Sequence, residues 1–342
     1  MKIIITAALV LGFSGWVYAE SAMTQLEAAS GLDKAAEVAM TASEQAVPAP
    51  ACRKADRPAV NVRILSFNIR TGLQLHIGNL GINSVPMWNH RRGDFIKIVK
   101  AAQADLIGLQ ETTEISLLFP MVSVHQFKDI AGALDGEFAS VHENASCGAD
   151  PKCANKYDAL IFYRTARFDL IDSGSFALSA TPDVPFSISS NDGWHQTFPR
   201  LVVYAHLRDK ASGRTFYFCT THFDNNTTTK QNSVELLAKL MPERLRLSEP
   251  AIFSGDFNLD SRNDPELMKG LLNGIWQDSE KAPAAGAAHP ASFDDGKSLI
   301  DHILFNKAGG MTVKSWEVLP NRVDPLAPPV SDHHPVQAEL MF

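Results

Sequence analysis

Short apolar runs rich in β-branched and aromatic residues recur along this chain, and most of them end in a polar cluster. Runs of this kind predict buried β-strands. A strand end is where a rigid scaffold can present several side chains to one pocket. The clusters are Ser66-Phe67-Asn68, Leu109-Gln110-Glu111, Thr221-His222-Phe223-Asp224, Gly255-Asp256-Phe257-Asn258, Ile300-Asp301-His302 and Ser331-Asp332-His333-His334-Pro335. The pattern therefore predicts a layered α/β protein whose site is built from strand ends.

The first 19 residues have the features of a secretory signal peptide. Lys2 supplies a basic start, residues 3–17 are largely apolar, and Val17-Tyr18-Ala19 offers tolerated residues before a cleavage point. The apolar run is interrupted by glycine and serine and falls short of the ~20 residues of a membrane span. We expect cleavage after Ala19 and export to the periplasm or the medium, without stable membrane insertion.

The rest of the chain is expected to form one domain behind a linker. Residues 20–57 are rich in alanine, serine and glutamate and end in Val47-Pro48-Ala49-Pro50, which predicts a flexible Ala/Pro-rich linker. Candidate site residues come from both halves of residues 58–342, so one domain is favoured over two. Strands are expected at 60–68, 106–110, 159–163, 201–205, 216–220, 251–254, 299–305 and 336–340, and helices at 88–102, 233–240 and 266–272.

Export makes disulfide bonds permissible, and the chain has four cysteines. Cys147 and Cys153 bracket a turn-like segment, which favours a local bridge. Cys219 lies in an apolar strand and is expected to be a small core residue, although a bridge to Cys52 stays open.

Two clusters offer ligands for a hard cation. Asn68 and Glu111 each follow an apolar strand, and carboxylate and amide oxygens suit Mg²⁺, with Mn²⁺ or Ca²⁺ as alternatives. Taken singly, Glu111 could equally be a charge at a helix N-terminus, and Asn68 could equally form a strand-end turn.

Two further clusters have polar residues two positions apart, which point to the same side of an extended segment. Asp256 and Asn258 flank Phe257, and His222 and Asp224 flank Phe223. The alternatives are an Asx turn for the first pair and a solvated loop for the second, since 225–228 is loop-like.

The last clusters bring imidazoles beside carboxylates. An aspartate that accepts a hydrogen bond from a histidine fixes its tautomer and raises its basicity, and Asp301–His333 is the pair we expect. His334 is expected to be a packing residue. The sequence has neither the Gly-x-Ser-x-Gly motif of serine hydrolases nor the His-Glu-x-x-His motif of zinc peptidases. The inventory fits hydrolysis of a phosphate ester.

In this order, and with Pro199-Arg200 among them, the clusters resemble the endonuclease/exonuclease/phosphatase superfamily. Residues 174–179 and 181–185 are further matches to its secreted bacterial branch. The resemblance covers residues 60–342. It implies a four-layer α/β sandwich with two packed mixed β-sheets flanked by helices.

The resemblance also implies roles for individual residues. Those expected at the metal are Asn68, Glu111 and Asp332. Those expected to act on the water or the phosphoryl group are His222, Asp256, Asn258, Asp301, His333 and, aligned only from its neighbours, Tyr157. Those expected to bind the substrate phosphate are Arg200 and Asp224. His302 replaces an aromatic residue that is frequent in relatives, which leaves open whether it reaches the site.

The function expected from the sequence is an exported Mg²⁺-dependent phosphodiesterase, in the first place a nuclease acting on DNA or RNA as a monomer. Alternatives are a sphingomyelinase-like phospholipid hydrolase, a sugar or inositol phosphate phosphatase, and a non-catalytic binding module. The net charge of −7 argues against a generally basic nucleic-acid coat protein. A local basic rim was expected from Arg91, Arg92, Lys156, Arg164 and Arg200.

Overall fold

The computed structural model describes residues 58–72, 85–117, 122–142, 156–184, 187–188, 193–280, 290–293 and 296–342. These residues belong to one compact unit, Lys54–Phe342. The expected signal peptide, the linker, Cys52 and the Cys147–Cys153 pair lie outside the described residues and stay predictions. Cys219 is buried and free.

The strands of the described residues form two sheets that both mix parallel and antiparallel pairs. The first sheet contains β12 (Thr312–Val318), β13 (Val336–Met341), β1 (Asn61–Asn68), β2 (Leu106–Leu117), β5 (Lys156–Arg164) and β4 (Phe138–His142) in that order, with β3 (Val122–His125) paired to β2. The second sheet contains β10 (Trp276–Asp278), β11 (Asp301–Asn306), β9 (Ala251–Asp256), β8 (Thr215–His222), β7 (Leu201–Asp209) and β6 (Phe168–Ala177).

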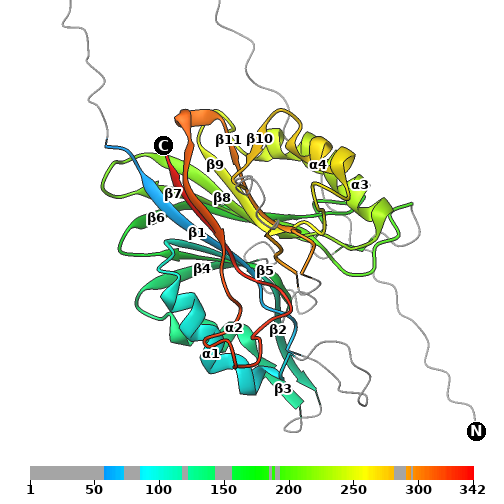
Figure 1. Cartoon of the computed structure of the whole chain (residues 1–342). Coiled ribbons are helices and arrows are strands. Elements are labelled where there is room, and N and C mark those ends of the chain that lie inside the picture. Colours follow the sequence, from blue (N-terminus) through cyan, green and yellow to red (C-terminus); the bar gives the residue numbers. More distant parts are fainter. Residues whose placement is uncertain are drawn as a thin grey trace, which may run out of the picture. The chain divides into compact units, whose positions relative to one another are not determined.

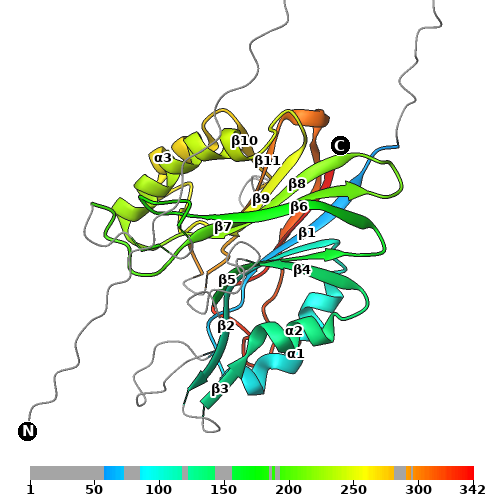
Figure 2. The same ribbon diagram turned by 180° about the vertical axis from the view of Figure 1, so that it is seen from behind.

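Helices cover the outer face of each sheet (Figures 1 and 2). The helices α1 (Trp88–Ala101) and α2 (Gln126–Ala133) lie on the first sheet, and α3 (Thr227–Arg244) and α4 (Pro265–Leu272) lie on the second. A short 3-10 turn, η3 (Ala308–Gly310), links β11 to β12. None of the described helices has an apolar stretch long enough to cross a bilayer. The predicted fold class, an α/β sandwich of two mixed sheets with flanking helices, is confirmed.

Three apolar clusters hold these layers together. One lies between the sheets and takes residues from both, such as Ile64 of β1 and Phe218 of β8. The others lie under the helices of the first sheet and of the second sheet. The strand β1 is buried on both faces, so its successive residues belong to different clusters. Ile64 lies in the core between the sheets, whereas Leu65 packs under α1.

The structure departs from the expected elements mainly at edges and helix ends. Helix α3 begins at Thr227, inside a segment predicted to be a loop, because the Asn226 side chain accepts a hydrogen bond from the Thr229 N–H and caps it. The strands β3, β4, β6, β10 and β12 and the helix α2 were not predicted. Both β6 and β12 are edge strands with many exposed residues, so they lack the apolar run on which a strand prediction depends.

The close approach of the two sheets generates a prediction at Gly108 of β2. A Cβ atom there would lie 2.5 Å from the Ser254 hydroxyl and 2.7 Å from the Thr220 hydroxyl, both on the opposite sheet. We expect Gly108→Ala to lower the free energy of unfolding by about 1–3 kcal/mol through overpacking. The measurement is urea denaturation.

The matched control is Gly93→Ala in α1, where a Cβ would meet no atom within 4 Å. Alanine is the better helix former, so this change should be neutral or stabilise by up to about 1 kcal/mol. Equal effects of the two substitutions would contradict the inter-sheet argument.

Candidate active site

Strand ends from both sheets meet at one edge of the sandwich. In the second sheet, His222 is paired with Asp256, and Asp256 is paired with Asp301. Residues paired across neighbouring strands project to the same face, so these three side chains stand in a row. In the first sheet, Asn68 ends β1 opposite Gln110, and Glu111 follows directly in β2. The predicted convergence of the strand-end clusters is confirmed for these residues.

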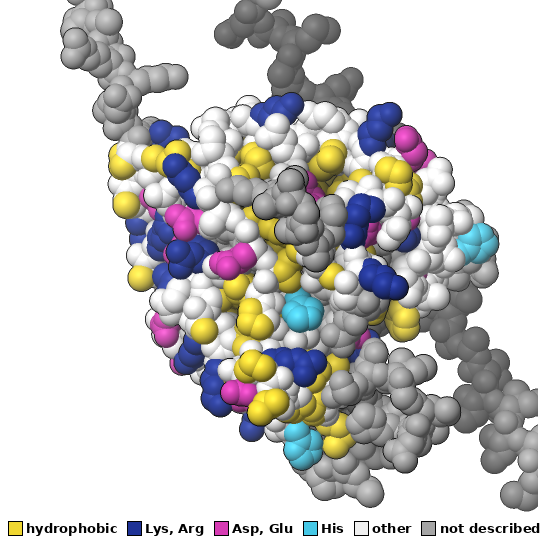
Figure 3. Space-filling view, in the orientation of Figure 1, with side chains coloured by type: hydrophobic (Ala, Val, Ile, Leu, Met, Phe, Trp, Pro, Cys, Tyr) yellow, Lys and Arg dark blue, Asp and Glu magenta, His cyan; other side chains and the backbone are white. Residues whose placement is uncertain are grey.

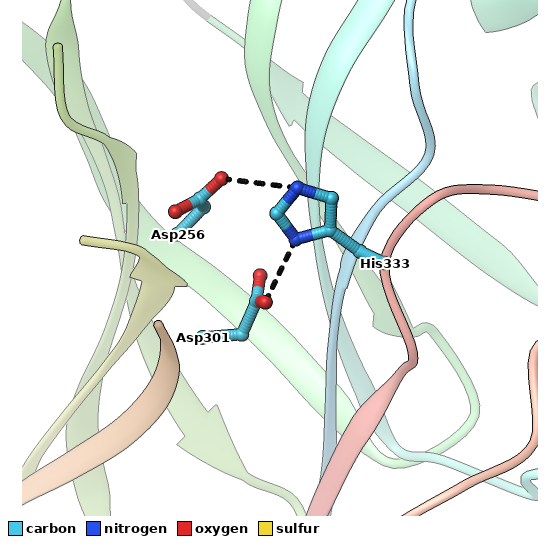
Figure 4. A group of neighbouring side chains, drawn as sticks. All are labelled: Asp256, Asp301 and His333. Carbon is cyan, nitrogen blue, oxygen red and sulfur yellow. Dashed lines mark hydrogen bonds and ion pairs between the residues drawn. The ribbon is translucent and has the colours of Figure 1, made fainter. Parts of the chain in front are cut away.

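The imidazole of His333 lies between two aspartates (Figure 4). Its Nδ1 is 2.8 Å from an Asp301 carboxylate oxygen, and its Nε2 is 3.7 Å from an Asp256 oxygen. Phe293 packs against the ring with a centroid distance of 5.0 Å. The predicted Asp301–His333 pair is therefore present, and the ligand atoms of Asp256, Asp301 and His333 lie within 4.8 Å of one another, close enough to hold a metal ion.

Burial and the neighbouring charges shift the pKa values of His333 and Asp256 in opposite directions. Burial lowers the pKa of His333, but the carboxylates of Asp301 and Asp256 outweigh it and raise the pKa to about 10. Burial raises the pKa of Asp301, and the neighbouring Asp256 adds to that effect. The charges of His333 and His222 lower the pKa of Asp256 despite its burial. At neutral pH, His333 is thus a cation and Asp256 an anion.

Asn68 connects the carboxylates of the two sheets. Its side-chain N–H group donates to Asp256 at 2.9 Å and to Glu111 at 3.2 Å, while its amide oxygen accepts the backbone N–H of Arg70 at 3.0 Å. The sequence analysis expected the amide oxygen of Asn68 to face a metal. In this arrangement its nitrogen faces the carboxylates instead, and Asn68 orients Glu111 and Asp256.

Asp332 is fully buried and forms an ion pair with Arg70, a residue that the sequence analysis did not single out. Burial raises the pKa of Asp332 and the nearby Glu111 charge raises it further, whereas His333 and Arg70 oppose the shift. Two carboxylates that repel each other in this way would be relieved by a cation. The only sequence signal for Arg70 was its place two residues after Asn68.

His222 extends the row toward a second cation. Its Nε2 is 3.5 Å from an Asp256 oxygen, its Nδ1 is 3.1 Å from an Asp158 oxygen, and the Arg200 guanidinium lies 2.6 Å from the same Nδ1. Arg200 also donates to Asp158 at 2.9 Å. Burial and Arg200 lower the pKa of His222, but the charges of Asp158 and Asp256 outweigh them and raise it.

Sequence reasoning missed Asp158. Its one signal was a carboxylate directly before the apolar run 159–163. The Arg200 and His222 charges lower the pKa of Asp158 although burial opposes them. The neighbouring Tyr157 lies in β5 opposite Thr112, and its side chain falls outside the described residues, so its predicted role stays a prediction.

Asn258 and Asp224 take positions that the extended-segment argument did not anticipate. The strand β9 ends at Asp256, and Asn258 adopts a left-handed conformation with φ of 50°. Its backbone N–H donates to Asp256 at 2.9 Å and its side chain donates to the Phe223 carbonyl. The prediction of one extended segment is wrong here, and the alternative Asx turn is found. Asp224 accepts two hydrogen bonds from Thr197 and so holds a loop.

The expected basic rim is present only in part. Arg91 is buried and donates to backbone carbonyls, including those of Ile69 and Val330. These hydrogen bonds hold the segment after β1 in place. Arg92 pairs with an aspartate of α2 and Arg164 with an exposed glutamate. Arg200 alone among these arginines touches the row of site residues, and the side chain of Lys156 lies outside the described residues.

His302 points away from the site. Its Nδ1 is 2.7 Å from Asp278 and its Nε2 is 2.9 Å from the Leu259 carbonyl, on the face of β11 opposite Asp301. Burial lowers the pKa of His302, but Asp278 outweighs it and raises the pKa to about 9. His302 therefore supports the turn after Asp256 from behind. His334 is half-buried beside the Leu319 carbonyl, in agreement with the expected packing role.

The raised pKa of His333 predicts how stability depends on pH. A charge stabilised in the folded state contributes fully below the ordinary histidine pKa of ~6.5 and is lost as pH rises through the folded value. We expect the unfolding free energy lost in His333→Asn to be large near pH 6 and to shrink toward pH 10, the folded-state value. Chemical denaturation in EDTA measures it.

The control is His334→Asn, because its imidazole contacts a backbone carbonyl. Its loss of stability should vary little over the same range. A loss in His333→Asn that is independent of pH would refute the assignment of the cation.

Comparisons with known proteins identify the family of this chain. Residues 65–333, well over half of the chain, match the model of the Endonuclease/Exonuclease/phosphatase family. A family protein from Bacteroides thetaiotaomicron is 27% identical, with 83% of this chain and 99% of that chain covered and a TM-score of 0.61. A mannosyl-6-phosphatase from the same organism is 28% identical, with 82% and 100% covered and a TM-score of 0.60.

An uncharacterized protein of Acanthamoeba polyphaga mimivirus is 23% identical over 59% of this chain and 68% of that protein. Taken together with the two stacked sheets and the strand-end site, the family match shows that this chain belongs to the endonuclease/exonuclease/phosphatase family.

Proposed function

We propose that this protein hydrolyses a phosphate ester with the help of a divalent cation. The observation that carries the proposal is the buried row in which the anion Asp256 lies between the imidazoles of His333 and His222, at 3.7 Å and 3.5 Å. Such a row offers one proton acceptor and two donors for phosphoryl oxygens, and positioning with charge neutralisation is what phosphoryl transfer requires.

The protonation states support Asp256 as the base. Asp256 is ionised because its pKa is lowered, so it can accept a proton from the attacking water. His333 is already protonated because its pKa is about 10, so it donates a hydrogen bond rather than acting as the base. The water oxygen bonds to phosphorus, the ester P–O bond breaks, and the leaving oxygen takes up a proton from solvent.

Glu111 and Asp332 are the residues that would hold the cation, for which we propose Mg²⁺ with Mn²⁺ or Ca²⁺ as alternatives. Their mutual repulsion and the hard oxygen donors fit such an ion. Bound there, the cation would supply a Lewis acid for a phosphoryl oxygen. Asn68 and Thr71 orient the Glu111 carboxylate by hydrogen bonds to its two oxygens.

For the substrate, we propose a small phosphate ester such as a sugar phosphate. The 28% identity to a mannosyl-6-phosphatase over its whole length favours this class. On the face shown in Figure 3, basic side chains are scattered among acidic and apolar ones rather than joined in a band. The nuclease expected from the sequence is the second candidate, since the family includes endonucleases. The signal-like residues 1–19 support export.

The charged row predicts the effect of removing its base. We expect Asp256→Asn to lower kcat on mannose 6-phosphate by at least about 100-fold, because the proton acceptor is lost. The control is Asp169→Asn, an exposed carboxylate of β6. Steady-state kinetics with thermal melts measures both, and unchanged turnover in Asp256→Asn would sink the assignment. Plasmid DNA and RNA, assayed alongside, decide between the two substrate candidates.

The metal site predicts a second result. EDTA should abolish hydrolysis, and added Mg²⁺ should restore it. Glu111→Gln should weaken Mg²⁺ binding by at least about tenfold in isothermal titration calorimetry, since a carboxylate ligand is lost. Glu137→Gln, at an exposed carboxylate, is the control. Equal Mg²⁺ affinity in the two variants would contradict the ligand assignment.

A further inference from the structure

An exposed aromatic ring lies beside the candidate site. Phe198 is 62% exposed, and it is the one aromatic residue among the large apolar side chains that are exposed in the described part of the chain. More than half of the Phe198 surface is therefore left uncovered by the fold and is available to a ligand. Its sequence neighbour Arg200 belongs to the row of charged residues.

The ring lies close to the row of site residues. The Arg200 guanidinium carbon lies 5.6 Å from the centre of the Phe198 ring. The same guanidinium contacts His222, whose other ring nitrogen is 3.5 Å from Asp256. A phosphate bound to the Arg200 guanidinium would therefore lie near the Phe198 ring, so that the alcohol part of the ester could contact it.

The backbone that carries Phe198 is firmly held. The Thr197 N–H and hydroxyl donate to the buried Asp224 carboxylate at 2.9 Å and 2.6 Å. On the other side, the Arg200 carbonyl accepts the Leu178 N–H at 2.7 Å. Pro199 restricts the residue before it to extended conformations. An exposed ring on a fixed backbone loses little conformational entropy when a ligand packs on it.

We propose that Phe198 is a binding platform for a ring in the alcohol part of the substrate, next to the scissile phosphate. The proposal rests on the proposed function and makes it more specific: the preferred ester carries a pyranose or a nucleobase rather than an open chain. Asp224, expected from the sequence to bind phosphate, acts here as a positioning residue that holds Thr197 and thereby the platform.

The test compares esters with and without a ring. Phe198→Ala should raise KM about tenfold for ring-bearing esters, since stacking on one aromatic side chain supports a loss of that size. The substrates are mannose 6-phosphate and adenosine 5′-monophosphate, with glycerol 3-phosphate as the ringless ester. For glycerol 3-phosphate, the kcat/KM of Phe198→Ala should differ from that of the wild type by less than about twofold. Phe198→Tyr should restore KM for the ring-bearing esters because it keeps the aromatic face.

The matched control is Ile171→Ala, which removes a 45% exposed apolar side chain from β6. Ile171 lies away from the end of β6 that pairs with Leu201. This substitution should leave KM and kcat/KM unchanged for all three esters. A higher KM for mannose 6-phosphate alone would indicate that the platform binds a sugar, and a higher KM for the nucleotide alone would indicate that it binds a nucleobase. Either result supports the platform. An equal loss on all three esters, or none, overturns it.

Calorimetric binding of the same three phosphates separates this inference from the proposed function. A wild-type protein that binds the ring-bearing esters more tightly than glycerol 3-phosphate, and loses that preference in Phe198→Ala, has the platform even if it hydrolyses none of them. Equal binding of the three by the wild-type protein overturns the platform, even if all three are hydrolysed.

Discussion

The buried carboxylate of Asp256 is the group on which the site depends. It is 1% exposed, and a carboxylate taken out of water is strongly destabilising unless charges and hydrogen bonds compensate it. Compensation comes from Asn68 of the first sheet and from His222 and His333 around it. One anion therefore requires both sheets to keep their register, and this couples the fold of the sandwich to the geometry of the site.

The backbone around this group is strained in a consistent way. Arg70, Glu111 and Asn258 all have positive φ, which costs a non-glycine residue of the order of 1 kcal/mol or more. Arg70 and Asn258 follow strand ends and donate to the buried carboxylates of Asp332 and Asp256, whereas the Glu111 carboxylate, within β2, accepts a hydrogen bond from the Asn68 side chain. Strain of this kind persists only where the surrounding contacts determine it, as the hydrogen bonds to Glu111 and Asp256 do here.

The residues around Arg200 explain how one scaffold can serve different esters. In the proposed function the charged row binds the phosphate, the group that every phosphate ester has in common. Selectivity has to come from what surrounds the row, where Asp158 fixes Arg200 and the Thr197 segment presents Phe198. Asp224 holds that segment through two hydrogen bonds from Thr197.

Much of the fold and part of the site could be predicted from the sequence. Apolar runs determine the buried strands, since a strand covered on both faces needs continuous apolar residues, as in β1. The pair Asp301–His333 was also predicted, because a carboxylate that accepts a hydrogen bond from an imidazole fixes its tautomer and raises its basicity. Edge strands such as β12 were missed, since exposure removes their apolar pattern.

Tertiary structure alone decided which charges meet. Asp158 and Arg70 lie at the site although the sequence did not indicate them, whereas the side chains of Arg91 and His302 point elsewhere. The direction of each side chain depends on where its strand ends and how the chain turns afterwards. The sequence determined that carboxylates, amides and imidazoles stand at strand ends. Their protonation, and hence the separate roles of Asp256 and His333, follow from burial and from neighbours 32 to 188 positions away in the chain, which only packing brings together.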